Sequence, residues 1–228
     1  NEITMTINTP LAVSVAIAAD ANPVCAGTTV TYTATPVNGG LTPVYQWYNG
    51  ATAVGTGTAT YSNVPANGDV ITVVLTSSET CQTGSPATSN TVTMVVNTAP
   101  SVTSAQTDVL CKGASTGAID ITVAGGTAPY TYAWTGTGVT AAAEDQTGLA
   151  AGSYSVVVTD AGSCSSAPLL VTISEPATAL SGSITAQINV SVYGGNNGSV
   201  TVAGSGGTGA YQYKLGSGSY QASGTFGS

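Results

Sequence analysis

The side chains of this sequence that could do chemistry are few, and they exclude most kinds of catalytic site. The 228 residues include four cysteines, ten acidic residues and two lysines, but no histidine and no arginine. Without histidine the usual Ser-His-Asp triad cannot be built, and without arginine no planar guanidinium can clamp an anion. We therefore expect a protein that is not an enzyme.

The acidic residues form no pattern typical of a glycosidase or of a dense calcium loop. Glu144 and Asp145 are adjacent, so a strand would point them to opposite faces, whereas a glycosidase pair must converge on one bond. Asp108, Asp120 and Asp160 could supply oxygen ligands to calcium, which takes about six to eight of them. Asp160 more simply opens the turn "DAGS". The sequence predicts no cofactor, with calcium as the alternative.

The four cysteines fall into two well-separated pairs and indicate disulfides in an oxidising compartment. Bonds of Cys25 with Cys81 and of Cys111 with Cys164 would each tie loops at one end of a domain. The immunoglobulin bridge, in contrast, crosses the core beside a tryptophan. Each bond would stabilise its domain by roughly 4 kcal/mol in the chain-entropy model. A zinc site is the alternative, but it would lack any Cys-x-x-Cys pair or histidine. We expect a secreted or cell-surface protein.

Charge and hydropathy restrict the partners of the chain. The net charge is −8, and Lys112 and Lys214 are the only cations, so little could neutralise a phosphate backbone. No apolar run approaches the roughly 20 residues that cross a bilayer, and no signal-like segment opens the chain. We expect no nucleic-acid partner and no membrane span, with any signal or anchor outside this segment.

The elements that position these side chains are predicted to be strands. The composition is rich in glycine and β-formers, and charged residues make up only 5%, so we expect almost no α-helix. The segments "TTVTYTAT" (28–35), "PVYQWYNG" (43–50) and "DVITVVLTSS" (69–78) alternate apolar and polar residues, and glycine-rich turns separate them. About seven such strands between Leu11 and Asn97 predict a β-sandwich.

Alternation along the strands also predicts the cores. Trp47 should point into the core of the first sandwich. Because neighbouring residues of a strand face opposite sides, Tyr48 should face outward, which makes it a candidate surface aromatic contact for a sugar. In the following domain Tyr130, Tyr132 and Trp134 lie on one face of "PYTYAWTG". We expect these three residues and Trp47 to form the cores.

The chain contains an internal repeat with a fixed offset of 81 residues. "GGTAPYTY" (125–132) recurs as "GGTGAYQY" (206–213), and Val192 stands where the counterpart of Cys111 is expected. This copy reaches Ser228 before the counterparts of the last strands appear. We expect half a domain whose core cannot close alone.

Several motifs resemble a known family. The run "CKGASTGAIDITVAGGTAPYTYAWTG", followed by "GLAAGSYSVVVTDAGSC" and "VTISEP", resembles the repeat named after SprB, the gliding-motility adhesin of Bacteroidetes. The domain before it is similar to the PKD-like or Ig-like domains found beside such repeats, through "NPVCAGTTVTYTATP", "YQWYNG" and "SNTVTMVVN". The resemblance implies very large surface proteins, exported by the type IX secretion route, that serve as adhesins or surface filaments. It supplies no catalytic residues.

The predicted architecture is all-β, with tandem Ig-like or PKD-like β-sandwiches in an extended rod. The opening "NEITMTIN" resembles "NTVTMVVN" at 90–97, so residues 1–10 are predicted to close a preceding domain. Residues 11–100 should form a PKD-like or Ig-like sandwich, 101–176 a SprB-type repeat, and 177–228 the N-terminal half of a further repeat.

These features predict a non-enzymatic, extracellular structural or adhesive segment of a large repetitive bacterial surface protein. Its expected partners are neighbouring domains of the array, copies of itself in a fibre, and surface glycans or a substratum. One alternative is a carbohydrate-binding accessory array of a secreted polysaccharide-degrading protein. Another is a strand-exchanging filament subunit, in which the segment from Glu2 to Asn8 completes a neighbour's open half-domain.

Overall fold

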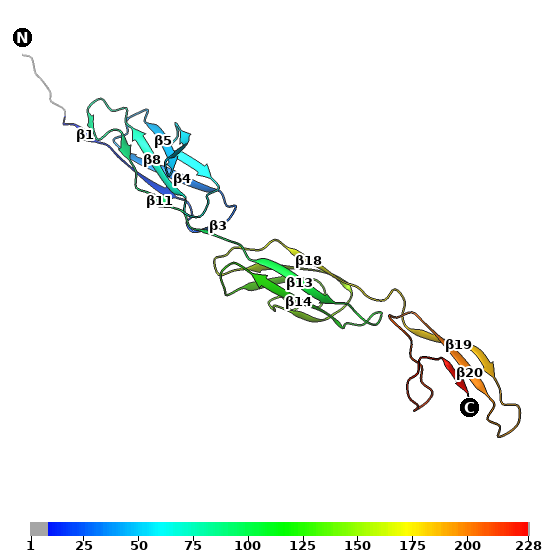
Figure 1. Cartoon of the computed structure of the whole chain (residues 1–228). Helices are drawn as coiled ribbons and strands as arrows, with labels where there is room; N and C mark the ends of the chain where they lie inside the picture. The colour runs from blue at the N-terminus through cyan, green and yellow to red at the C-terminus, as the bar shows by residue number, and fades with distance from the viewer. Residues whose placement is uncertain (1–8, 228) are drawn as a thin grey trace, which may run out of the picture. The chain divides into compact units, whose positions relative to one another are not determined.

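A computed structural model describes residues 9–227, and every regular element among them is a β-strand (Figure 1). The predicted fold class is therefore confirmed, and the described residues include no helix that could span a membrane. The predicted closing strand at 1–10 and the donor segment from Glu2 to Asn8 fall largely or wholly outside the described range. The four-part division of the chain stays a prediction.

The described residues group into two compact units. Unit 1 contains the residues up to Pro100 together with two loops, Gly125–Pro129 and Asp160–Cys164. Unit 2 contains Ser101–Ala124, Tyr130–Thr159 and the residues from Ser165 onward.

Unit 1 is a β-sandwich of two main sheets. Its strands, in chain order, are β1 (Leu11–Ala12), β2 (Ser14–Ala19), β3 (Val24–Cys25), β4 (Val30–Val37), β5 (Val44–Asn49), β6 (Thr52–Thr56), β7 (Thr60–Asn63), β8 (Val70–Thr76), β9 (Gln82–Thr83), β10 (Ala87–Thr88), β11 (Val92–Thr93) and β12 (Val96–Asn97). One antiparallel sheet has the order β2-β4-β7. The other has the order β10-β8-β5-β6, and β11 also pairs with β8. Two short parallel pairs, β1 with β9 and β3 with β12, complete the unit.

The alternation of side chains explains how the two sheets of unit 1 meet. In β4, Val30, Tyr32 and Ala34 are buried, while threonines of the same strand face outward. Trp47 in β5 is fully buried, and its indole N–H donates to the carbonyl of Thr58 at 3.0 Å. Because that donor is satisfied, the ring can fill the core without leaving a buried polar group unpaired.

Unit 2 contains a second sandwich and a separate sheet. Its strands, in chain order, are β13 (Ser101–Thr107), β14 (Gly117–Ala124), β15 (Thr131–Thr135), β16 (Gln146–Leu149), β17 (Gly152–Thr159), β18 (Leu169–Ile173), β19 (Ser181–Ile188), β20 (Ser199–Ser205) and β21 (Thr225–Gly227). The sheets β13-β14-β16 and β15-β17-β18 enclose a core, and β19-β20-β21 form the third sheet.

The core of the second sandwich is centred on Trp134. This residue is buried, and its indole N–H donates to the carbonyl of Ala143 at 2.9 Å. Tyr130 and Tyr132 are partly buried and pack against the core at its edge. Trp134 and Trp47 thus occupy the predicted interior positions, while the two tyrosines lie at the margin.

The internal repeat is visible in the backbone. Gly125 and Gly126 have φ angles of 73° and 66°, and Gly206 and Gly207, 81 residues further along, have the same two values. Positive φ angles of this kind are readily adopted only by glycine. The β13–β14 hairpin likewise recurs as the β19–β20 hairpin. The offset found in the sequence therefore relates equivalent backbone positions.

The third sheet differs from its counterpart in burial. None of the described residues from 177 to 227 is buried, and Ile184 and Ile188 of β19 are exposed. Val200 and Val202 of β20 are only half-buried. Within the described range this sheet has no closed core.

Replacing Trp47 with alanine should remove the centre of the unit 1 core. Truncation of a fully buried tryptophan lowers the free energy of unfolding by about 3–5 kcal/mol. Val44→Ala is the matched control, because Val44 lies on the same strand and its side chain is 57% exposed. Urea denaturation followed by far-UV circular dichroism measures both variants. Equal midpoints would contradict the assigned core.

Candidate functional site

The distinctive site within residues 9–227 is one disulfide. Cys25 is bonded to Cys164, with a Cα–Cα distance of 5.5 Å and a sequence separation of 139 residues. Such a Cα distance is usual for a disulfide. Both cysteines belong to unit 1. We call Cys25 and the loops Gly125–Pro129 and Asp160–Cys164 the disulfide clamp.

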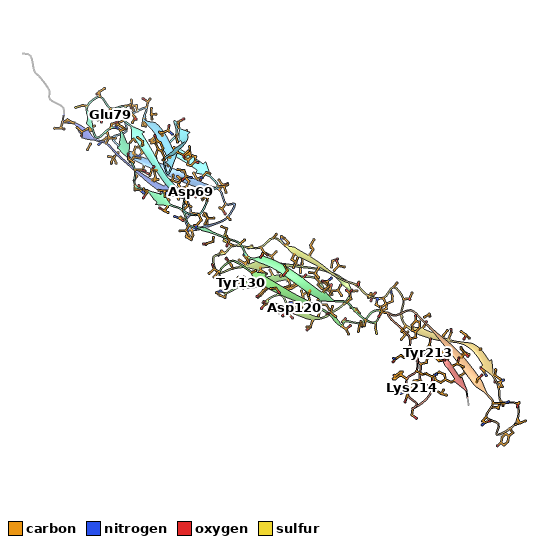
Figure 2. All side chains as sticks on the ribbon, in the orientation of Figure 1. Asp69, Glu79, Asp120, Tyr130, Tyr213 and Lys214 are labelled. Atoms are coloured by element: carbon orange, nitrogen blue, oxygen red, sulfur yellow. A yellow bond between two sulfur atoms is a disulfide. The ribbon has the colours of Figure 1, made fainter. Side chains whose placement is uncertain are left out.

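The predicted bond between Cys25 and Cys81 is wrong. Cys25 ends β3, whereas Cys81 directly precedes β9, which pairs with β1. Figure 1 shows β1 and β3 at opposite ends of unit 1, and Figure 2 shows the same for Asp69 and Glu79, which flank β8. The seven residues of β8 span about 23 Å. Cysteines whose Cα atoms are more than about 7 Å apart cannot be bridged without backbone movement.

The predicted bond between Cys111 and Cys164 is wrong for the same reason. Val109, two residues before Cys111, donates its N–H to the carbonyl of Ser174, directly after β18. Because β17 and β18 are antiparallel, the end of β18 lies beside the start of β17. Cys164 instead follows the end of β17, whose eight residues span about 26 Å. The structure places Cys111 as an exposed residue outside the disulfide.

Asp160 organises the turn that carries Cys164. One carboxylate oxygen accepts the N–H of Cys164 at 2.8 Å, and the other accepts the N–H of Thr127 at 2.9 Å. The Asp160 carbonyl accepts the N–H of Ser163 at 3.0 Å, which closes the turn. The N–H of Cys164 above all holds the pKa of Asp160 below its usual value, against the opposing effect of burial. The sequence-based interpretation of Asp160 as a turn residue is confirmed.

Close packing fixes both loops of the clamp against the rest of unit 1. A Cβ on Gly126 would lie 3.0 Å from a carboxylate oxygen of Asp160 and 3.2 Å from the Cδ of Pro100. A Cβ on Gly162 would lie 3.1 Å from the side-chain nitrogen of Asn97. These glycines were not recognised as site residues in the sequence. The repeated "GGT" motif was the available signal for the first of them.

The candidate calcium ligands are not brought together. Asp108 accepts the N–H of Ser174 at 2.8 Å, and this bond lowers its pKa. Asp120 is exposed in β14 (Figure 2), and Asp160 belongs to the clamp. Within the described range no group of three or more acidic, cysteine or histidine residues could hold a metal ion.

The aromatic side chains of unit 1 gather in its core. The ring of Tyr61 stacks on those of Tyr32 and Trp47, with 5.9 Å between centroids in each pair. Burial, with a smaller effect of nearby Asp69, raises the pKa of Tyr32 to about 12. Tyr48, the candidate surface aromatic, is half-buried in β5. A sugar contact at Tyr48 stays a prediction.

These features define an all-β protein built from β-sandwiches, with one disulfide among its described residues. Its sequence matches the SprB repeat family at residues 103–139 and 184–219, two stretches that begin 81 residues apart. The resemblance to SprB-type surface proteins is therefore confirmed. SprB repeats belong to cell-surface proteins, and the disulfide is compatible with an extracellular location.

Solved structures of Ig and fibronectin(III)-like domains are similar to the chain at low sequence identity. The Down Syndrome Cell Adhesion Molecule, represented by its N-terminal eight Ig domains, is 15% identical with a TM-score of 0.48; the match covers 72% of this chain and 26% of that chain. The fibronectin(III)-like modules of Clostridium thermocellum CbhA are 21% identical with a TM-score of 0.36, over 69% and 92% of the two chains. No curated protein sequence matches significantly.

Acid should weaken the clamp through Asp160. Its folded-state pKa lies below the unfolded value of about 3.9, so the carboxylate stabilises the fold at pH values above the unfolded pKa. That contribution is lost as the pH falls through the folded pKa. Asp160→Asn should lower the melting temperature at neutral pH and flatten its decline on acidification.

Melting curves recorded from about pH 7 down to about pH 2 test the role of Asp160. Asp120→Asn, which changes an exposed carboxylate of β14, is the control and should follow the unmodified protein throughout. An Asp160→Asn profile parallel to that of the unmodified protein would contradict the proposed stabilisation.

Proposed function

We propose that this chain is a non-enzymatic, extracellular segment of a large repetitive surface protein, and that it acts as a load-bearing spacer for adhesion. Its proposed partners are neighbouring repeats of the same array, with glycans or a substratum contacted elsewhere in the parent protein. Secretion is supported by the disulfide, because such bonds persist in oxidising compartments. The SprB matches support export by the type IX route.

The observation that supports this proposal is the position of the disulfide, which provides a covalent shortcut between the two ends of the chain. Tension applied to the two chain ends passes from Cys25 through the sulfur atoms to Cys164. The interval that the bond bypasses spans 139 residues in sequence and includes both core tryptophans, Trp47 and Trp134. While the bond is intact, pulling on the chain ends cannot extend the residues between Cys25 and Cys164, which include most of the buried residues of both cores. This property suits a protein that is stretched at a cell surface.

Stretching single molecules of the full chain from both ends tests the load path. The oxidised chain should reach a final contour length shorter than that of the reduced chain by roughly 470 Å, because the bypassed interval spans 139 residues at about 3.4 Å each. Cys164→Ser is the control and should give the long contour in both conditions. Equal lengths for the oxidised and reduced protein would overturn the load-bearing role.

A glycan array separates the spacer from the carbohydrate-binding alternative. The full chain should show no micromolar binding to any polysaccharide. Micromolar binding that is lost in Tyr48→Ala would instead favour a carbohydrate-binding accessory array. Tyr220→Ala, which changes an exposed aromatic residue, is the control and should leave such binding unchanged.

A further inference from the structure

Cys111 occupies the same local structure as the bonded Cys25. Each cysteine begins a tight turn, in which the carbonyl of Cys25 accepts the N–H of Thr28 at 3.1 Å and that of Cys111 accepts the N–H of Ala114 at 3.0 Å. The glycine two residues after each cysteine has a positive φ angle, 86° in the first turn and 77° in the second. The two backbones therefore present their thiols from equivalent turns.

The two turns also lie at equivalent ends of their sandwiches. Val24, just before Cys25, donates its N–H to Val95 near the end of the first sandwich at 3.0 Å. Val109, two residues before Cys111, donates its N–H to the carbonyl of Ser174, after the last strand of the second sandwich, at 2.9 Å. Each cysteine is thus held beside the point where the chain leaves its sandwich.

The partner of Cys25 is Cys164, which stands at a position that also has a counterpart, Cys81, in the first sandwich. Val73 and Val156 are the residues that pair with the core tryptophans of the two sandwiches. Cys81 and Cys164 each stand eight residues after the respective valine. The observed bond therefore joins the cysteine at the exit of one sandwich to the cysteine that follows the central strand of the next domain in sequence.

A cavity adjoins Cys111, at the place where a bond of the same kind as Cys25–Cys164 would bring the partner cysteine. Its volume is about 640 Å³, and Leu110 and Cys111 form part of its wall. Gly207 and Thr208 also line it, and they are the counterparts, 81 residues on, of clamp residues 126–127. In the clamp, Thr127 donates its N–H to Asp160, whose turn carries Cys164, and a Cβ on Gly126 would lie 3.0 Å from the same carboxylate. The equivalent receptor for such a turn is therefore present beside Cys111.

We propose that Cys111 forms a disulfide with a cysteine at the position equivalent to Cys164 in the repeat that contains residues 184–219. That position lies 81 residues after Cys164 and beyond Ser228, so the inference rests on the proposed function of the chain as part of an array. An aspartate-led turn carrying this cysteine occupies the part of the cavity beside Gly207 and Thr208. Because Cys111 lies inside the interval closed by Cys25 and Cys164, the two bonds overlap and couple successive repeats.

The oxidation is balanced by a thiol–disulfide oxidant of the secretory compartment. The two thiols lose two protons and two electrons as their sulfur–sulfur bond forms. The disulfide of the oxidant is broken and becomes a dithiol, which takes up both protons and both electrons. Exposure of Cys111 allows the oxidant to reach it.

Disulfide mapping of the native protein from its source tests the proposal. The protein is alkylated without reduction, digested with chymotrypsin and a glutamate-specific protease, and analysed by mass spectrometry. We expect the Cys111 peptide to be bonded to a peptide from outside residues 1–228, in which an aspartate stands four residues before the cysteine. The Cys25–Cys164 peptide in the same digest is the internal control. Alkylated Cys111, or Cys111 bonded to Cys81 or to a second copy of itself, would overturn the proposal.

The intact mass of the reduced and denatured native chain separates this inference from the proposed function. A mass well above 22.2 kDa with alkylated Cys111 leaves the array standing and overturns only the second disulfide. A mass near 22.2 kDa overturns both, because no further repeat would then exist to supply the partner.

Discussion

Each sandwich depends on one tryptophan that fills the space between two short sheets. Trp47 and Trp134 are both buried, and each donates its indole N–H to a carbonyl of a nearby loop. Domains of this size bury a limited share of their surface, so packing alone leaves them marginally stable. A disulfide that closes an interval of 139 residues adds roughly 5 kcal/mol in the chain-entropy model. The covalent bond thus supplements two small cores at once.

The comparison of β14 with β20 shows what a sequence pattern can and cannot determine. Both strands belong to the same repeat and form equivalent hairpins. Ile119 and Ile121 of β14 are buried because the sheet β15-β17-β18 covers them, whereas Val200 and Val202 of β20 are only half-buried. Alternation therefore selects the strand and the face of each side chain, but burial requires a second sheet.

The same distinction explains which expectations held. The strands β4, β5 and β8 were predictable because a period of two is a local signal, and so was the Asp160 turn. The short strand β16 has no such alternation and was missed. Cysteine pairing was not predictable, because four cysteines allow three connectivities and each choice depends on which strand ends meet in space.

The disulfide and Asp160 stabilise the same turn through different states of the chain. The bond acts chiefly by restricting the unfolded ensemble, whereas the carboxylate acts in the folded state by accepting the N–H groups of Thr127 and Cys164. Those hydrogen bonds do not depend on the sulfur atoms being joined. They can therefore set the position of Cys164 before oxidation, so that the thiol reaches Cys25 in a geometry that the disulfide then retains. One aspartate and one cysteine, four residues apart, thus order the turn in the folded state and restrict the chain in the unfolded state.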